Sequence, residues 1–127
     1  MSKRYVLDSS AILAVINSEN GEDKVEPKFR DSVVSSVNVA EVLTKLAERD
    51  VDLNDALNYF LNVGLEIAEF DIALALRTAA LRPATKHLGL SLGDRACLAL
   101  AMQENAIAVT ADKTWKSLDV CKIELIR

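Results

Sequence analysis

The chain has 127 residues, half of them hydrophobic, with 15 basic and 19 acidic residues and a formal net charge of −4 at pH 7. This length and composition suit a single folded domain over residues 1–127 and exclude a disordered chain. The negative charge argues against a simple basic DNA-binding module. The apolar stretches are too short to span a membrane and the first residues form no leader, so we expect a cytoplasmic protein.

The first third of the chain alternates between strand-like and helix-like patterns. Residues 3–7 have β-branched and aromatic members and predict a short strand, and the apolar run after it predicts a helix over 9–16. A charged segment, 22–30, predicts a short helix disturbed by Pro27. Residues 32–36 predict a second strand.

Two amphipathic helices are expected next, from residue 38 to 47 and from 53 to 63, because each carries its apolar residues on one face. Residues 65–70 predict a third strand. A helix over 71–81 follows, with Asp71 as its cap, and Pro83 ends it.

Ser91 begins a helix that is apolar almost all round, which indicates a deeply buried element. The continuous apolar run 106–109 predicts a buried parallel strand. A short helix over 112–118 and a last strand over 120–126 complete the chain. Strands that alternate with helices predict an α/β fold with four to five strands in a mostly parallel sheet.

Four acidic residues stand where these elements meet: Asp8 and Asp112 close strands, and Glu41 and Asp94 open helices. In a parallel sheet the carboxyl ends of the strands and the following helix starts share one edge. Four carboxylates gathered there would form a site for hard divalent cations such as Mg²⁺ or Mn²⁺. Such ions promote phosphodiester hydrolysis, and no phosphate-binding loop or nucleophile elbow indicates another reaction.

Each acid also has a purely structural interpretation. Residues 38–41 and 91–94 fit the capping-box pattern, and Asp8 and Asp112 fit helix N-caps. The two interpretations are compatible, because a helix N-terminus favours an ionised carboxylate.

Polar residues beside the acids are candidate supports. Three hydroxyls lie at the same junctions: Ser9, Ser10 and Thr110. Three basic residues flank the later acids and are candidate contacts for phosphate oxygens of the substrate: Arg95, Lys113 and Lys116. Turn, cap and solvated surface roles are the alternatives for all six.

Two cysteines and one histidine add no further site. Cys97 and Cys121 lack metal-site spacing and are expected to be buried free thiols, and His87 is expected in a solvated loop. Trp115 is expected in the core.

Four segments in order resemble the signatures of PIN-domain ribonucleases, above all the VapC toxins of toxin–antitoxin pairs: residues 6–11 (VLDSSA), 36–42 (SVNVAEV), 90–96 (LSLGDRA) and 109–112 (VTAD). The resemblance runs nearly end to end and implies a three-layer α/β/α sandwich. It implies that the four acids hold one or two Mg²⁺ or Mn²⁺ ions, supported by the Thr110 hydroxyl, and that RNA, often tRNA or rRNA, is cut internally. Ser9 stands where many relatives have Thr, which keeps the hydroxyl.

The resemblance also implies a cognate VapB-like antitoxin whose tail blocks the site, and commonly a toxin homodimer. Five apolar residues are candidates for a groove that takes the tail, with a place in the core as the alternative: Ile12, Val15, Ile16, Val25 and Phe29.

Two other functions remain open on the sequence. A receiver-like signalling domain is also a parallel α/β fold with an acidic Mg²⁺ pocket, and Thr110 and Lys113 would suit it, although the acidic pair expected after the first strand is absent. A non-catalytic binding scaffold would show no metal affinity at the acidic edge.

Overall fold

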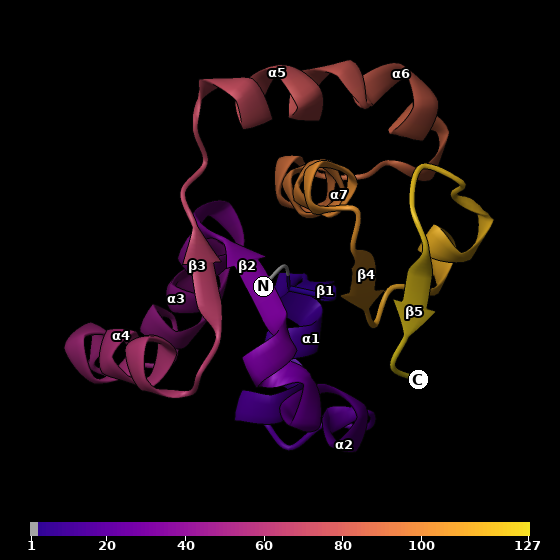
Figure 1. Cartoon of the computed structure of the whole chain (residues 1–127). Helices are drawn as coiled ribbons and strands as arrows, with labels where there is room; N and C mark the ends of the chain where they lie inside the picture. The colour runs from indigo at the N-terminus through magenta and orange to yellow at the C-terminus, as the bar shows by residue number, and fades with distance from the viewer. Residues whose placement is uncertain (1–2) are drawn as a thin grey trace.

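The computed structural model describes residues 3–127, and its centre is one sheet of five parallel strands (Figure 1). The strands are β1 (Tyr5–Leu7), β2 (Ser32–Ser35), β3 (Glu66–Ala68), β4 (Ile107–Thr110) and β5 (Ile123–Leu125). Their order is β3-β2-β1-β4-β5, and every neighbouring pair is parallel. The predicted parallel α/β fold is therefore confirmed.

Helices cover both faces of the sheet, which makes the sandwich three-layered. On one side lie α1 (Ser9–Ile16), α2 (Glu22–Val25), the 3-10 helix η1 (Glu26–Asp31), α3 (Ser36–Ala47) and α4 (Leu53–Asn62). On the other lie α5 (Ile72–Ala80), α6 (Arg82–Thr85), η2 (Lys86–Leu88) and α7 (Leu92–Glu104), while η3 (Lys113–Ser117) precedes β5. Figure 1 shows α5, α6 and α7 above the sheet and α1 and α2 below it.

The central strands are hydrophobic on both faces, because each face carries its own core. Val6 packs in the core that contains α7, whereas its neighbour Leu7 packs in the core that contains α1. Side chains alternate between the faces of a strand, so β2 and β4 divide in the same way. Their members are Val33 and Ala108 on the α7 side and Val34 and Val109 on the α1 side.

One predicted helix start is wrong, and the structure adds detail at two positions near prolines. The helix expected over 22–30 is an α-helix that changes to a 3-10 helix at Glu26, next to Pro27. The helix expected from residue 38 begins at Ser36, because β2 runs directly into α3. Pro83 lies in the first turn of α6, where a proline is tolerated, instead of only ending α5.

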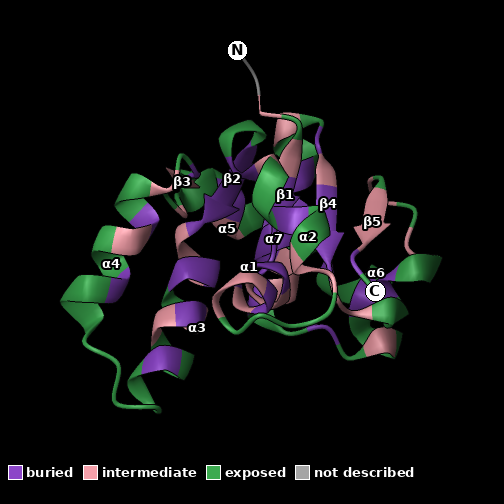
Figure 2. Cartoon of the chain, turned by 90° about the horizontal axis from the view of Figure 1, so that it is seen from below, coloured by how far each residue is buried: buried purple, intermediate pink, exposed green. Residues whose placement is uncertain are grey.

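The buried interior is centred on α7, as its sequence predicted. Seven of its residues are buried, among them Cys97, and Trp115 is fully buried beside it. Both cysteines are free, but Cys121 is only half-buried, and His87 is exposed. Figure 2 shows the buried residues concentrated in the central strands and in the inner turns of the helices. Within residues 3–127, no helix is long and apolar enough to cross a membrane.

Candidate active site

The first acid, Asp8, directly follows β1 and is the N-cap of α1. Its side chain is only 3% exposed and accepts hydrogen bonds from the Ala11 backbone N–H (2.9 Å), the Ser10 hydroxyl (2.7 Å) and the Thr110 hydroxyl (2.5 Å). Burial raises the pKa of Asp8 to about 6, although these three hydrogen bonds oppose the rise. The hydrogen bonds therefore hold the Asp8 carboxylate in place, but they do not fully offset the effect of burial on its charged form.

Two hydroxyls join the ends of β1 and β4. The Thr110 oxygen, which donates to Asp8, accepts the backbone N–H of Asp112 at 3.0 Å. The Ser10 oxygen accepts the backbone N–H of Ala111 at 2.9 Å. The loop that carries Asp112 is thus held against the loop that carries Asp8.

Glu41 lies in α3, half-buried, and its carboxylate is held from two sides. Its Oε1 accepts from the Ser9 hydroxyl at 2.9 Å and from the side-chain amide of Asn38 at 2.8 Å. The same amide donates to the backbone carbonyl of Gly93 at 3.1 Å. These contacts link α1, α3 and α7 at one point.

The capping box expected at residues 38–41 is wrong. The N-cap of α3 is Ser35, whose hydroxyl accepts from the Val37 N–H, so Asn38 lies within the first turn. Asn38 is 1% exposed, and its amide is free to bond Glu41 and Gly93 because no capping is required of it. The capping-box pattern predicted a position for Asn38 at the helix start, and no local pattern indicated its contacts with Glu41 and Gly93.

Gly93, in the first turn of α7, is the second residue that sequence analysis missed. A Cβ added there would lie 2.2–2.4 Å from the carboxyl atoms of Glu41, far inside van der Waals contact. Only a glycine leaves room for this carboxylate against α7. The sequence does contain one indication of this role. A glycine in a helix is less favourable than alanine by about 1 kcal/mol, so a glycine in an otherwise strongly helical segment suggests a close contact.

Asp94 follows Gly93 and forms the predicted capping box with Ser91. Burial is the main reason that the pKa of Asp94 is raised, and the carboxylates of Glu41 and Asp112 raise it further. Asp94 in turn contributes to the raised pKa of Asp8. Asp94 is therefore within electrostatic reach of the other three acids, each of which comes from a separate segment.

Asp112 is the N-cap of η3, as predicted. Its Oδ1 accepts from the backbone N–H of Thr114 at 2.9 Å and from the Thr114 hydroxyl at 2.8 Å. Its other oxygen is available to a ligand, since neither hydrogen bond uses it.

The acidic edge has the donor chemistry for a hard cation, but the side chains are not arranged as a finished metal site. Among residues 3–127, no three His, Cys, Asp or Glu side chains form a group that could hold a metal ion as they stand. The two ion pairs formed by the same residues involve none of the four acids. Four carboxylates without a basic partner fit a divalent cation, provided that they adjust on binding.

The three basic candidates differ in their surroundings. Arg95 is half-buried, and its Nη1 donates to the Thr78 carbonyl at 3.0 Å, which joins α7 to α5. Its Nε has no partner within the described residues. Lys113 and Lys116 are exposed on η3, directly after Asp112.

The five apolar candidates for a groove divide into two groups. Ile12, Val25 and Phe29 are buried in the core. Val15 and Ile16 are half-buried and line a surface cleft of about 650 Å³ together with residues of α3 and α4.

An α/β sandwich with its acids at the carboxyl ends of parallel strands belongs to the class whose site lies at that edge of the sheet. The model of the PIN domain family matches residues 5–120. The chain therefore belongs to the PIN domain family. No curated protein matches the sequence.

Solved structures share this fold at low sequence identity. A toxin–antitoxin complex from Klebsiella pneumoniae is 17% identical with a TM-score of 0.77, and the match covers 97% of this chain and 98% of that one. VapBC2 from Rickettsia felis, bound to a promoter DNA fragment, is 22% identical with a TM-score of 0.74 and coverages of 95% and 97%. DNA-bound VapBC from Salmonella typhimurium is 17% identical with a TM-score of 0.74 and coverages of 98% and 99%.

Proposed function

We propose that the chain is a metal-dependent endoribonuclease and the toxin of a VapBC-type toxin–antitoxin pair. The observation that carries the proposal is the convergence of Asp8, Glu41, Asp94 and Asp112, from four separate segments, at one edge without a basic partner. Membership of the PIN family and the toxin–antitoxin complexes among its structural neighbours support the same activity.

In this proposal the four carboxylates hold one or two Mg²⁺ or Mn²⁺ ions. When bound, such ions would activate a water, orient the phosphodiester and stabilise the leaving oxygen. The protein holds the ligands in advance: Thr110 and Ser10 donate to Asp8, while Ser9 and Asn38 donate to Glu41. A carboxylate oxygen that does not bind a cation is available to orient the attacking water.

The proposed substrate is RNA, with tRNA and rRNA as the candidates. Lys113 and Lys116 are exposed beside Asp112, so their ammonium groups are free to meet phosphate oxygens. Arg95 has less freedom, because one of its nitrogens already bonds Thr78. We therefore assign phosphate contact first to the two lysines.

The proposed partners are a VapB-like antitoxin and a second copy of the toxin. The structural neighbours are described as toxin–antitoxin complexes, which supports the first. The cleft lined by Val15 and Ile16 is our candidate surface for an antitoxin tail, because these two are the groove residues that remain accessible.

The receiver-like alternative is not supported by the topology. Receiver domains have the strand order 2-1-3-4-5, whereas this sheet has the order β3-β2-β1-β4-β5. The non-catalytic scaffold is the remaining alternative, and it predicts no cleavage by the pure protein.

The direct test compares the parent protein with Asp94→Asn in cleavage of total RNA, with mapping of the new RNA ends. We expect cleavage with Mg²⁺ or Mn²⁺, none in EDTA, and a loss of about 100-fold or more in the variant, because a ligand charge is removed. Asp71→Asn is the matched control, since Asp71 caps α5 through the Leu74 N–H and is not among the acids that raise the pKa of Asp94 or Asp8. A folded Asp94→Asn protein that cleaves as well as the parent would contradict the proposal.

A further inference from the structure

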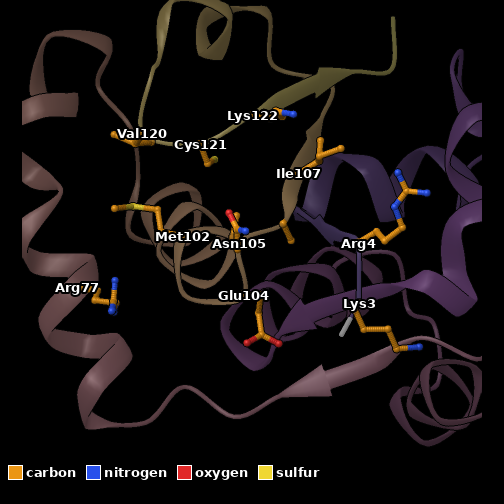
Figure 3. A pocket seen from close by; sticks show the side chains of 12 residues that line it. Lys3, Arg4, Arg77, Met102, Glu104, Asn105, Ile107, Val120, Cys121 and Lys122 are labelled. Carbon is orange, nitrogen blue, oxygen red and sulfur yellow. The ribbon is translucent and has the colours of Figure 1, made fainter. Parts of the chain in front are cut away.

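Figure 3 shows a second cleft, of about 670 Å³. It lies at the amino ends of the strands, opposite the four acids. The residue pair before β1, the last turn of α7 and the starts of β4 and β5 form its walls, together with α5. Its charged lining consists of Lys3, Arg4, Arg77, Lys122 and Glu104. Along α7, Asp94 is about 10 Å from Ala101 and about 15 Å from Glu104, the first and last residues of this helix that line the cleft, at about 1.5 Å per residue.

The cleft is strongly positive in a chain that is negative overall. Four basic residues and one acid line the cleft, which leaves three positive charges (4 − 1), while the whole chain has a net charge of −4. Within residues 3–127, none of these five side chains takes part in an ion pair. The positive charge is therefore not neutralised by the protein.

Of the four basic residues, Arg77 and Lys122 have the fewest contacts with the rest of the protein, and they lie on different walls of the cleft. In Figure 3, Arg77 comes from α5 on one side, and Lys122 comes from the opposite side near β5. Both side chains are exposed and make no hydrogen bond within the described residues. By contrast, Lys3 donates to the Arg30 carbonyl, and the Arg4 guanidinium lies 5.7 Å from the centre of the Tyr5 ring.

Stabilisation of a helix end does not account for the cluster. Cations are favourable near a helix C-terminus, and α7 ends in this cleft without a basic residue in its last turn. However, its C-cap Asn105 already has a left-handed conformation and donates its N–H to the Ala101 and Met102 carbonyls. A single cation would be enough to stabilise the C-terminal end of the α7 dipole, and four basic residues line the cleft.

We propose that this cleft binds the phosphate of a nucleotide, either free or at the end of an RNA chain. Guanidinium and ammonium groups are the usual protein partners of phosphate. The volume lies within the range of about 300–1,000 Å³ that is usual for small-molecule sites. Met102, Ile107 and Val120 supply an apolar wall on which a base can pack. The site is independent of the proposed nuclease activity, because it uses none of the four acids.

The first experiment is calorimetric titration of the full chain in EDTA with adenosine monophosphate, and with adenosine as the control without phosphate. We expect saturable binding of the monophosphate, weaker at high salt, and none of adenosine. Backbone amide shifts in an NMR titration should concentrate at residues 102–107 and leave Asp8 unchanged. Absence of binding by both the monophosphate and a 5′-phosphorylated RNA would overturn the proposal, as would shifts centred on the acidic edge.

Charge variants give the sharper test, because the expected effects have opposite signs. Arg77→Gln and Lys122→Gln should each weaken binding about fivefold, whereas Glu104→Gln should strengthen it by a similar factor. Lys45→Gln, at an exposed lysine on α3, is the matched control and should change nothing. Equal affinities across all four variants would overturn the proposal.

A competition experiment distinguishes the two possible ligands, a free nucleotide and the phosphorylated end of an RNA chain. A short RNA with a 5′-phosphate should displace the labelled monophosphate better than the same RNA with a 5′-hydroxyl if the natural ligand is an RNA end. If the two RNAs compete equally poorly, the free nucleotide is the ligand. Asp94→Asn should bind the monophosphate as the parent does, so a failure of the nuclease proposal leaves this result intact.

Discussion

Glu41 reaches the acidic edge through two uncharged residues, Asn38 and Gly93. Asn38 bonds both the Glu41 carboxylate and the Gly93 carbonyl, and Gly93 leaves the space that the carboxylate occupies. The position of one proposed metal ligand therefore depends on the close approach of α3 to α7.

Gly93→Ala separates activity from stability. The new methyl group would overlap the Glu41 carboxyl atoms and displace them from the Ser9 and Asn38 donors. Because alanine gains about 1 kcal/mol over glycine in a helix and the Glu41 side chain is flexible, we expect an unchanged or slightly altered melting temperature. We expect RNA cleavage to fall about 10-fold or more, measured on the same preparation.

The control for this variant is Gln103→Ala, at an exposed position of the same helix. A second test is Gly93→Ala combined with Glu41→Asp, in which the shorter acid leaves room for the methyl group and should restore part of the cleavage. Full activity of Gly93→Ala alone would show that the position of Glu41 does not matter.

Asp8 gives the metal-free protein a defined pH dependence. Burial raises its pKa from 3.8 to about 6, so the folded protein binds this proton more tightly than the unfolded chain. The stabilisation is fully present below the unfolded value and is lost as the pH rises through about 6. From this group alone we expect the free energy of unfolding to fall by roughly 3 kcal/mol between about pH 4 and about pH 7.

Urea denaturation in EDTA across this pH range measures the effect. In Asp8→Asn the fall should be smaller, because the amide cannot ionise. A parent and variant with the same slope would show that Asp8 does not titrate in this window.

At the scale of elements, some of the carboxylates that cap helices also belong to the proposed active site, and others only cap. Asp8 and Asp112 follow the central strands β1 and β4 and cap their helices among the four acids. Asp71 follows the outermost strand β3 and caps α5, and Asp52 caps α4. The capping hydrogen bonds are alike, so the local sequence does not distinguish the two kinds, whereas the place of each cap relative to the central strands does.

Asp71→Ala tests this difference. Loss of the hydrogen bond to the Leu74 N–H should lower the free energy of unfolding by about 1 kcal/mol, with RNA cleavage per folded molecule unchanged. Asp112→Asn should behave in the opposite way, because asparagine also caps helices but carries no charge. Chemical denaturation and a cleavage assay on both variants give the comparison. If Asp71→Ala loses cleavage while it remains folded, capping and function are not separable in this way.

At the scale of the whole molecule, charge is divided between the two ends of the sheet. The acids lie at the carboxyl ends of the strands, and the basic cleft lies at their amino ends, with α7 running from one to the other. The net charge of −4 conceals this division, because it sums both ends. The negative net charge of the whole chain therefore does not argue against an anionic ligand at either end of the sheet.

Local patterns in the sequence predict the helices, the strands and the four candidate acids. Alternating strands and helices, the β-branched and aromatic residues of β1, and the caps at Asp8, Asp71 and Ser91 are local patterns, and each is recognised within a few neighbouring residues. Parallel topology then predicted that the acids share an edge.

The tertiary structure alone decided which side chains meet. The contact of Asn38 with Gly93 joins residues 55 positions apart, and the bond from Arg95 to Thr78 fixes a side chain that its charge had suggested for RNA. The basic cleft likewise gathers Lys3, Arg77 and Lys122 from three distant segments. Such contacts depend on how helices pack across the sheet, and no local pattern of residues encodes that packing.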